Sequence, residues 1–240
     1  MRYESKPIPA TFLKRPNRFL GVADLGGRRV ECFIPNPGRM HELLYPGAKV
    51  YLMEKAGSHR KTRYDMILVA HEGTMVSLDS RLPNLLLTEA VESGALPEFR
   101  SYRVVRSEPV FEDSRLDLLL TRNGSNLLLE AKSCTLLDDG VALFPDSPTT
   151  RGTRHIRALA RALDCYEAAV VFVVQRPDAR AFAPHWVMDP AFSEALASAV
   201  ANSVQAYAYR CEVSLEGVRI AGRLPLKLDN PFDYRETLEG

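Results

Sequence analysis

The feature that most constrains this 240-residue chain is an Asn-Gly pair, Asn123-Gly124, between two short runs made largely of leucine. The pair is typical of a two-residue β-hairpin turn, because both central residues of a type I′ turn need positive φ. In a hairpin centred on this pair, Asp117 faces Glu130 directly across the two strands. Lys132 lies two residues beyond Glu130 and therefore projects from the same face of the sheet.

Two facing carboxylates in leucine-rich strands need a neutralising partner, because like charges repel across a ladder and burial penalises both. A divalent cation such as Mg²⁺ would neutralise them, since hard cations take carboxylate oxygens, carbonyls and water. Lys132 could then assist a water molecule or stabilise charge on a phosphate. A salt bridge from Lys132 to either carboxylate, or strand ends that emerge into solvent, explains the pattern equally simply. Spacing alone leaves these alternatives open, because short D…ExK patterns also arise by chance.

The residues that follow match the signatures of a known family. Residues 130–136 read Glu-x-Lys-Ser-x-Thr-Leu, and residues 144–152 read Phe-Pro-Asp-x-x-Thr-Thr-Arg-Gly. Further matching segments at 33–40, 82–84 and 172–176 extend the similarity over nearly the whole chain. The chain therefore resembles the sugar fermentation stimulation protein A family. The resemblance implies a DNA-binding protein in which a small barrel domain precedes a nuclease-like domain of the PD-(D/E)xK type.

The first eighty residues have the pattern of a small β-barrel. Polar and apolar side chains alternate in short runs with turn residues between them, which is typical of strands. We expect a helical turn at 40–44 and five strands, near 19–23, 29–34, 49–53, 64–69 and 74–78. Five such strands predict a closed barrel, most commonly of the oligonucleotide-binding (OB) type. Aromatic residues of such barrels can stack on bases, but Phe19 and Phe33 are better explained as barrel core.

We assign residues 1–82 to this OB-fold-like barrel and residues 83–240 to a restriction-endonuclease-like α/β domain. Asn84 is the expected cap of a first helix over 85–96, and a strand near 102–111 precedes the Asn-Gly hairpin. The remaining elements are read from periodicity and from continuous apolar runs. They are a helix over 150–166, a buried strand at 168–174, a helix over 190–201 and a final strand at 205–213.

Cations and hydroxyls that could contact phosphate gather in three segments. One is a loop rich in Pro and Gly that matches the family motif, and another is the loop before Tyr64. The third is the start of the helix over 150–166, where amides and hydroxyls suit an anion and arginines recur on one face. A row of arginines is also typical of a solvated helix face, and His155 within it is best explained as a surface or packing residue. The predicted nucleic-acid contacts are Arg39, Arg60, Lys61, Thr150, Arg151, Arg154 and Arg157.

The resemblance also implies a metal site. By analogy with PD-(D/E)xK proteins, Mg²⁺ or Mn²⁺ is expected to bind Asp117, Glu130 and the backbone carbonyl of Ala131, with Lys132 completing the catalytic group. Such proteins often add a glutamate from the first helix, which makes Glu89 a further candidate ligand, although a solvated helix charge explains it as well. We therefore expect metal-dependent cleavage of DNA. The alternatives are a non-catalytic, non-specific DNA-binding regulator of sugar (maltose-type) metabolism and an enzyme acting on a small phosphate ester.

Composition narrows the class of protein without naming its partner. The net charge is +1, yet residues 1–80 carry 13 Lys and Arg against 8 Asp and Glu, which suits a polyanion such as DNA. The four cysteines form no C-x-x-C pair, so we expect no structural zinc and a reducing compartment. The amino terminus lacks a secretory apolar region, and the longest apolar run, 168–174, is too short for a bilayer. We expect a cytoplasmic protein without membrane contact, and leave a homodimer open.

Overall fold

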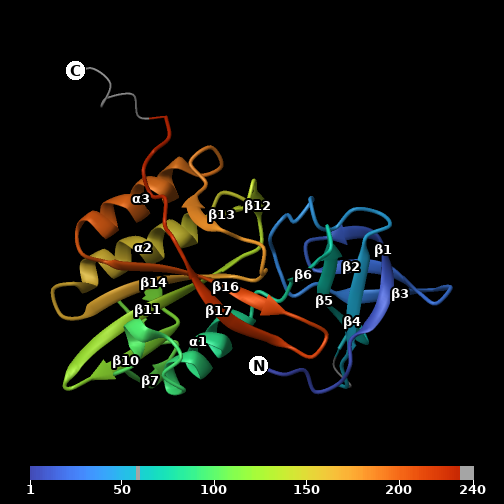
Figure 1. The fold of residues 1–240 in the computed structure, drawn as a ribbon, viewed down its shortest axis with the longest axis horizontal. Coiled ribbons are helices and arrows are strands. Elements are labelled where there is room, and N and C mark those ends of the chain that lie inside the picture. The colour runs from blue at the N-terminus through green and yellow to red at the C-terminus, as the bar shows by residue number, and fades with distance from the viewer. Residues whose placement is uncertain (58–59, 233–240) are drawn as a thin grey trace.

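Two sheets lie side by side in the computed structural model, which describes residues 1–57 and 60–232 (Figure 1). The first sheet lies at the amino-terminal end of the chain and the second carries the helices. The predicted second domain runs to residue 240, so its last eight residues lie outside the described part. No helix among the described residues is long and apolar enough to cross a membrane.

The first sheet forms the predicted barrel. Its strands follow the order β3-β2-β1-β4-β5-β6, and a parallel pairing of β3 with β5 closes it around one apolar core. Its strands are β1 (Ile8–Asn17), β2 (Leu20–Leu25), β3 (Arg28–Phe33), β4 (Lys49–Glu54), β5 (Tyr64–His71) and β6 (Thr74–Ser77). The five expected strands are confirmed.

Strand β1 is the element that the pattern missed. Only Ala10 and Phe12 of its ten residues are buried, and its second half carries Lys14 and Arg15, so apolar alternation is weak. The predicted helical turn at 40–44 is confirmed as a single turn. Its one helical hydrogen bond runs from the Leu44 N–H to the Met40 carbonyl, over 2.9 Å.

The second sheet has the order β17-β16-β14-β11-β10-β7, with β11, β14 and β16 parallel at its centre. Its strands are β7 (Arg103–Ser107), β10 (Leu118–Arg122), β11 (Ser125–Cys134), β14 (Glu167–Val174), β16 (Gln205–Val213) and β17 (Val218–Leu224). Helices α2 (Thr150–Ala162) and α3 (Pro190–Ala201) cover one face, and α1 (Leu82–Glu92) covers the other (Figure 1). Smaller elements are η1 (Pro97–Phe99), β8 (Val110–Phe111), β9 (Ser114–Arg115), β12 (Leu137–Asp138), β13 (Val141–Phe144) and β15 (Ala181–Pro184).

The central strand β14 shows why this sheet is covered on both sides. Alternate residues of the strand point to opposite faces of the sheet. Val170 and Phe172 pack in the core under α2 and α3, whereas Val171 and Val173 pack in the core under α1. The strand therefore reads as one continuous apolar run, as predicted, and the architecture is the restriction-endonuclease-like α/β fold.

Two details of this domain differ from the prediction. Helix α1 starts at Leu82 rather than at 85, its cap residue Arg81 makes no side-chain cap bond, and Asn84 lies inside the helix. The strand at 205–213 is followed by a further antiparallel strand, β17. Its edge position leaves most of its side chains partly or fully exposed, so little apolar patterning marks it.

One buried amide, that of Gln175 at the end of β14, joins the barrel to the central sheet. Its Oε1 accepts a hydrogen bond from Ser77 Oγ of β6 over 2.9 Å. Its Nε2 donates to the Asp79 carbonyl over 3.0 Å and to Ser133 Oγ of β11 over 2.8 Å. The side chain is wholly buried. A buried polar group of this kind is costly to leave without partners.

Replacing Gln175 by alanine is therefore expected to lower the free energy of unfolding by about 2–4 kcal/mol, because Ser77, Ser133 and Asp79 each lose a buried partner. Equilibrium unfolding in urea measures this loss. The matched control is Gln205→Ala, which removes a partly exposed amide that bonds only the Tyr207 hydroxyl. Equal, small losses for the two variants would show that the junction does not depend on Gln175.

Candidate metal centre and nucleic-acid interface

The hairpin that presents the predicted carboxylates has the expected register. Leu118 pairs with Leu129 and Arg122 with Ser125, and Asp117 stands one residue before β10, with its N–H donating to the Leu129 carbonyl over 3.1 Å. Asn123 and Gly124 both have positive φ, 48° and 88°, as a type I′ turn requires. The predicted hairpin is confirmed, and Asp117 lies directly before its first strand, where its carboxylate accepts from the N–H of Ala131, the residue after Glu130.

Glu130 is the most buried acid of the site, with 3% of its surface exposed. Its Oε1 lies 2.5 Å from Lys132 Nζ and 2.5 Å from His155 Nδ1. Burial by itself would raise the pKa of Glu130, but the charge of Lys132 and the hydrogen bond from His155 bring it below the usual value. The second oxygen, Oε2, is buried and has no hydrogen-bond partner.

Asp117 is held from two sides. Its Oδ1 accepts a hydrogen bond from Asn84 Nδ2 of α1, and its Oδ2 accepts one from the Ala131 backbone N–H, both over 2.7 Å. Burial, and then the nearby charge of Glu130, raise the pKa of Asp117 to about 6, although both hydrogen bonds and Lys132 act to lower it. The carboxyl is mostly ionised at neutral pH, which leaves two negative groups on neighbouring strands.

His155 belongs to this site, and the sequence interpretation did not assign it there. It is buried, and it lies on the inner face of α2 with Ile156 and Leu159. An ionised Glu130 can only accept, so His155 Nδ1 carries the hydrogen, and its Nε2 is free to accept from Arg151 Nε at 3.4 Å. The signal in the sequence was the helical register, which places position 155 among buried positions.

Asn84 was missed for a different reason. As the expected cap of α1 its side chain would have bonded the helix backbone, whereas the observed start of the helix at Leu82 leaves it free to reach Asp117. Asn84 and the Ala131 N–H together fix the orientation of the Asp117 carboxylate.

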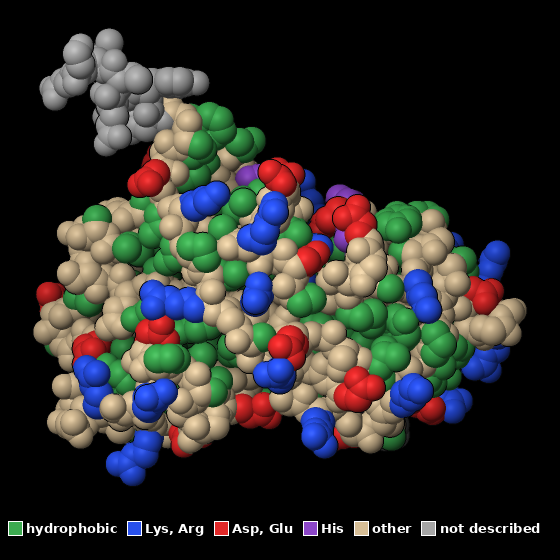
Figure 2. Space-filling view, viewed as in Figure 1, with side chains coloured by type: hydrophobic (Ala, Val, Ile, Leu, Met, Phe, Trp, Pro, Cys, Tyr) green, Lys and Arg blue, Asp and Glu red, His purple; other side chains and the backbone are tan. Residues whose placement is uncertain are grey.

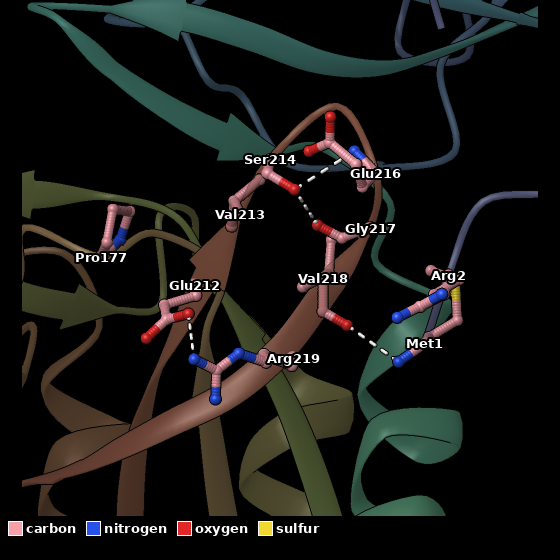
Figure 3. A pocket seen from close by; sticks show the side chains of 10 residues that line it. All are labelled: Met1, Arg2, Pro177, Glu212, Val213, Ser214, Glu216, Gly217, Val218 and Arg219. Atoms are coloured by element: carbon pink, nitrogen blue, oxygen red, sulfur yellow. Dashed lines mark hydrogen bonds and ion pairs between the residues drawn. The ribbon is translucent and has the colours of Figure 1, made fainter. Parts of the chain in front are cut away.

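The structure does not bring Glu89 to the carboxylate pair. Its carboxylate is half exposed and lies 2.7 Å from the amino group of Met1. That amino group also donates to the Val218 carbonyl over 3.0 Å, beside a pocket of about 450 Å³ between the first residues and the β16–β17 hairpin (Figure 3). Throughout the described ranges, no three His, Cys, Asp or Glu side chains are grouped closely enough to hold a metal. The candidate donors are therefore Asp117, Glu130 and the carbonyl of Ala131.

Arg39 lies where the barrel meets the second domain. Its backbone N–H donates to Asp146 Oδ2 over 2.7 Å, while its side chain is exposed. Arg15 holds this loop, because its guanidinium donates to the carbonyls of Asn36, Gly38 and Arg39 over 2.7–2.9 Å. Arg15 therefore holds the loop backbone, whereas the Arg39 side chain is exposed to solvent.

Arg60 and Lys61 differ in their surroundings. Arg60 forms an ion pair with the buried Asp65, which also bonds Arg81 at 3.2 Å. The charge of Arg60 is thus largely compensated inside the protein. Lys61 is exposed.

The four predicted contacts on α2 divide into two groups. Thr150, Arg151, Arg154 and Arg157 are all exposed, and the helix is capped by Thr149 Oγ1, which accepts from the Gly152 N–H. Arg151 contacts His155 beside the carboxylates. Arg154 and Arg157 instead line a surface pocket of about 440 Å³ together with Thr150, Arg161 and the acidic Asp113. Lys and Arg side chains are otherwise interspersed with Asp and Glu on the face seen in Figure 2.

Family models match both domains of this chain. A family model described as the sugar fermentation stimulation protein RE domain matches residues 81–217, and one described as the SfsA N-terminal OB domain matches residues 13–78. The chain belongs to the sugar fermentation stimulation protein family. A homolog from Moorella thermoacetica is 46% identical over 224 residues, which is 92% of this chain and 97% of the homolog. One from Pyrobaculum arsenaticum is 44% identical over 92% of this chain and 94% of its own length.

A solved relative shows the same fold over both domains. The structure of Pyrococcus furiosus SfsA in complex with Ca²⁺ is 32% identical and superposes with a TM-score of 0.88, covering 95% of this chain and 98% of that one. The barrel and the α/β domain therefore have the same arrangement in this chain and in that relative.

Proposed function

We propose that this protein cleaves phosphodiester bonds of DNA with the help of a divalent metal ion. The observation that carries the proposal is the Glu130 Oε2 atom, which is buried without a partner beside a second carboxylate, Asp117. Native proteins rarely leave such an atom unsatisfied, and a buried carboxylate oxygen without a donor suits a cation.

The donor set fits Mg²⁺ or Mn²⁺. Asp117, Glu130 and the Ala131 carbonyl offer hard oxygen ligands, and Mg²⁺ commonly uses only one or two carboxylates and keeps several waters. The Ca²⁺ complex of the Pyrococcus relative supports a hard-cation site in this family. Bound between these groups, the ion would supply Lewis-acid charge that polarises a phosphodiester and lowers the pKa of a water molecule.

The protein's own residues would orient this chemistry. His155 holds Oε1 of Glu130 and leaves Oε2 free, while Asn84 and the Ala131 N–H hold Asp117. Lys132 Nζ lies within 2.5 Å of Glu130 and is the cation best placed to stabilise negative charge that develops on a phosphate. Arg151, one helical turn before His155, extends positive charge from the site toward the backbone of a bound strand.

DNA would be held by the groups that border the site. Arg39 at the domain junction, Lys61 on the barrel and the exposed start of α2 present cations and hydroxyls to phosphate. Affinity that rests on such contacts falls log-linearly with salt concentration, because each contact releases counterions.

One observation favours a non-catalytic DNA-binding regulator as the second candidate. Lys132 already compensates the charge of Glu130 Oε1 without any metal, and His155 adds a hydrogen bond to the same atom, as a purely structural ion pair would require. The metal proposal is favoured over it for two reasons. Glu130 Oε2 has no hydrogen-bond partner, and the raised pKa of Asp117 shows that its negative charge is not fully stabilised by the protein.

A cleavage panel separates the candidates. Linear, nicked, branched and single-stranded DNA, and a small phosphodiester such as bis(p-nitrophenyl) phosphate, are incubated with the protein in Mg²⁺, in Mn²⁺ or in EDTA. We expect cleavage of at least one DNA form in metal and none in EDTA. Salt-dependent DNA binding without cleavage in either metal would support the regulator, and turnover of the small ester alone would indicate an enzyme for small phosphate esters.

A further inference from the structure

Phe19 is exposed where the sequence predicts a core residue. It lies in the turn between β1 and β2, and 44% of its surface is accessible. Its ring stacks on Phe33, with the ring centres 6.0 Å apart and the planes 16° from parallel. The guanidinium of Arg81 lies 5.8 Å from the centre of the Phe33 ring. The prediction that both rings fill the barrel core is wrong: Phe19 lies at the hairpin tip, outside the barrel, and Phe33 is partly exposed and does not pack in the barrel core.

The exposed ring is held in a fixed position. Asn17 Oδ1 accepts hydrogen bonds from the backbone N–H groups of Phe19 and Leu20, over 2.9 and 3.0 Å, and so fixes the turn. The Phe19 carbonyl accepts from the Ile34 N–H over 2.9 Å, which ties the turn to the end of β3. An aromatic ring that is fixed before binding loses little conformational entropy when a flat ligand stacks on it.

Several arginines belong to the segments next to this ring. Arg18 is the adjacent residue and is exposed. Arg15 donates to the carbonyls of both Arg18 and Arg39, over 2.6 and 2.7 Å, so the hairpin tip and the Arg39 loop lie side by side. The nearby acid, Asp146, already accepts the Arg39 N–H. Arg15, Arg18 and Arg39 thus lie near this turn with one nearby acid, Asp146, and this excess of positive charge suits the phosphates of a nucleic-acid strand.

The stack leads toward the carboxylate site. Arg81, over the Phe33 ring, is the cap residue of α1 and is anchored by Asp79 at 2.6 Å. Asn84 lies one helical turn later and bonds Asp117. A strand that passes over Phe19 and Arg81 is thereby led toward Asp117 and Glu130.

We propose that Phe19 is a stacking platform for an unpaired nucleobase, and that the DNA handled by this protein therefore carries a single-stranded segment next to the carboxylate site. This inference rests on the proposed function, which it deepens by naming the class of substrate. Bases inside a duplex are stacked on one another and cannot present a face to a protein side chain, whereas every base of a single strand can.

The test uses the full chain in EDTA, so that binding is measured without cleavage. Single-stranded oligonucleotides that carry the fluorescent base 2-aminopurine, and matched duplexes, are titrated with the wild type, Phe19→Leu, Phe19→Trp and Phe232→Leu. Leucine keeps the apolar volume without an aromatic face, and tryptophan restores one. Phe232 is also an exposed phenylalanine, with 54% of its surface accessible against 44% for Phe19, so it serves as the control.

We expect Phe19→Leu to weaken single-strand binding roughly 5- to 30-fold, since one base–aromatic stack contributes on this scale, and to remove the quenching of 2-aminopurine. Phe19→Trp should restore binding, and duplex affinity should change less than about twofold for every variant. Single-strand affinity unchanged in Phe19→Leu, or lost equally for single strands and duplexes, would overturn the proposal. So would a change in self-association alone, which would make Phe19 a protein contact.

The outcome is separable from that of the cleavage panel. If the protein cleaves DNA but Phe19→Leu binds single strands as the wild type does, only the stacking proposal fails. If Phe19→Leu selectively loses affinity for single strands in EDTA but no DNA form is cleaved in metal, only the proposed catalysis fails.

Discussion

Replacement of Lys132 by methionine is expected to lower the rate of metal-dependent DNA cleavage roughly 100- to 1,000-fold, the usual loss when one preorganised charge donor is removed from a transition state. Methionine keeps most of the volume of the side chain but carries no charge. In the wild type the ammonium group competes for Glu130 at 2.5 Å, so its removal should leave metal affinity unchanged or tighter. Catalysis and metal binding are thus expected to change independently in this variant.

Two measurements on the Lys132 variant decide what the residue does. Single-turnover cleavage gives the rate, and calorimetric titration with Mg²⁺ gives the affinity. Lys227→Met removes an exposed lysine and serves as the control. If Lys132→Met cleaves within about threefold of the wild type, the lysine is only the ion-pair partner of Glu130, and its catalytic assignment is wrong.

Asp117→Asn is expected to change the pH dependence of stability in the metal-free protein. The folded-state pKa of Asp117 is about 6 against an ordinary value of 3.8, so the folded state binds the proton more tightly than the unfolded state does. The free energy of unfolding of the wild type therefore falls as pH rises from about 4 to about 6, and stays lower above that range. Allowing for the partial exposure of Asp117, this loss is roughly 1–2 kcal/mol.

The asparagine variant cannot ionise and lacks this loss. It also gives up one accepted hydrogen bond, from Asn84 or from the Ala131 N–H, which costs about 1 kcal/mol at every pH. We expect the variant to be less stable than the wild type at pH 4.5 and about equally stable at pH 7.5. Urea unfolding in EDTA at both pH values measures the difference, with the exposed Asp164→Asn as control. A difference that does not change with pH would show that burial and the charge of Glu130 do not raise the pKa of Asp117 in the folded protein.

The parts of this protein that could be predicted are those set by local sequence. An Asn-Gly turn fixes a hairpin register, so the pairing of Leu118–Arg122 with Ser125–Leu129 follows from a few residues. The continuous apolar run of β14 similarly identifies a strand that is covered on both faces. The weakly patterned strands β1 and β17 were missed, because one is largely polar and the other lies at a sheet edge.

The rest of the site depends on tertiary contacts that no local pattern specifies. His155 and Asn84 reach the carboxylates from two helices on opposite faces of the sheet, 25 and 33 residues away from their partners in the chain. Glu89 lies on the first helix, as the resemblance implies. Its carboxylate, however, pairs with the amino group of Met1 and not with the carboxylate site. Phe19 is of a residue type that is usually buried in cores, and only the position of the hairpin tip in the fold shows that it is exposed.

The central claim is that Asp117 and Glu130 form a metal site, and thermal unfolding with and without Mg²⁺ tests it most directly. A ligand that binds only the folded state stabilises it by about 2.7 kcal/mol at one hundred times its dissociation constant, which corresponds to roughly 5–10 °C for a chain of this size. We predict a rise of this order for the wild type in saturating Mg²⁺ or Mn²⁺ and none for Asp117→Asn at the same pH. An equal shift in both proteins, or no shift in either while both still bind DNA, would contradict the claim.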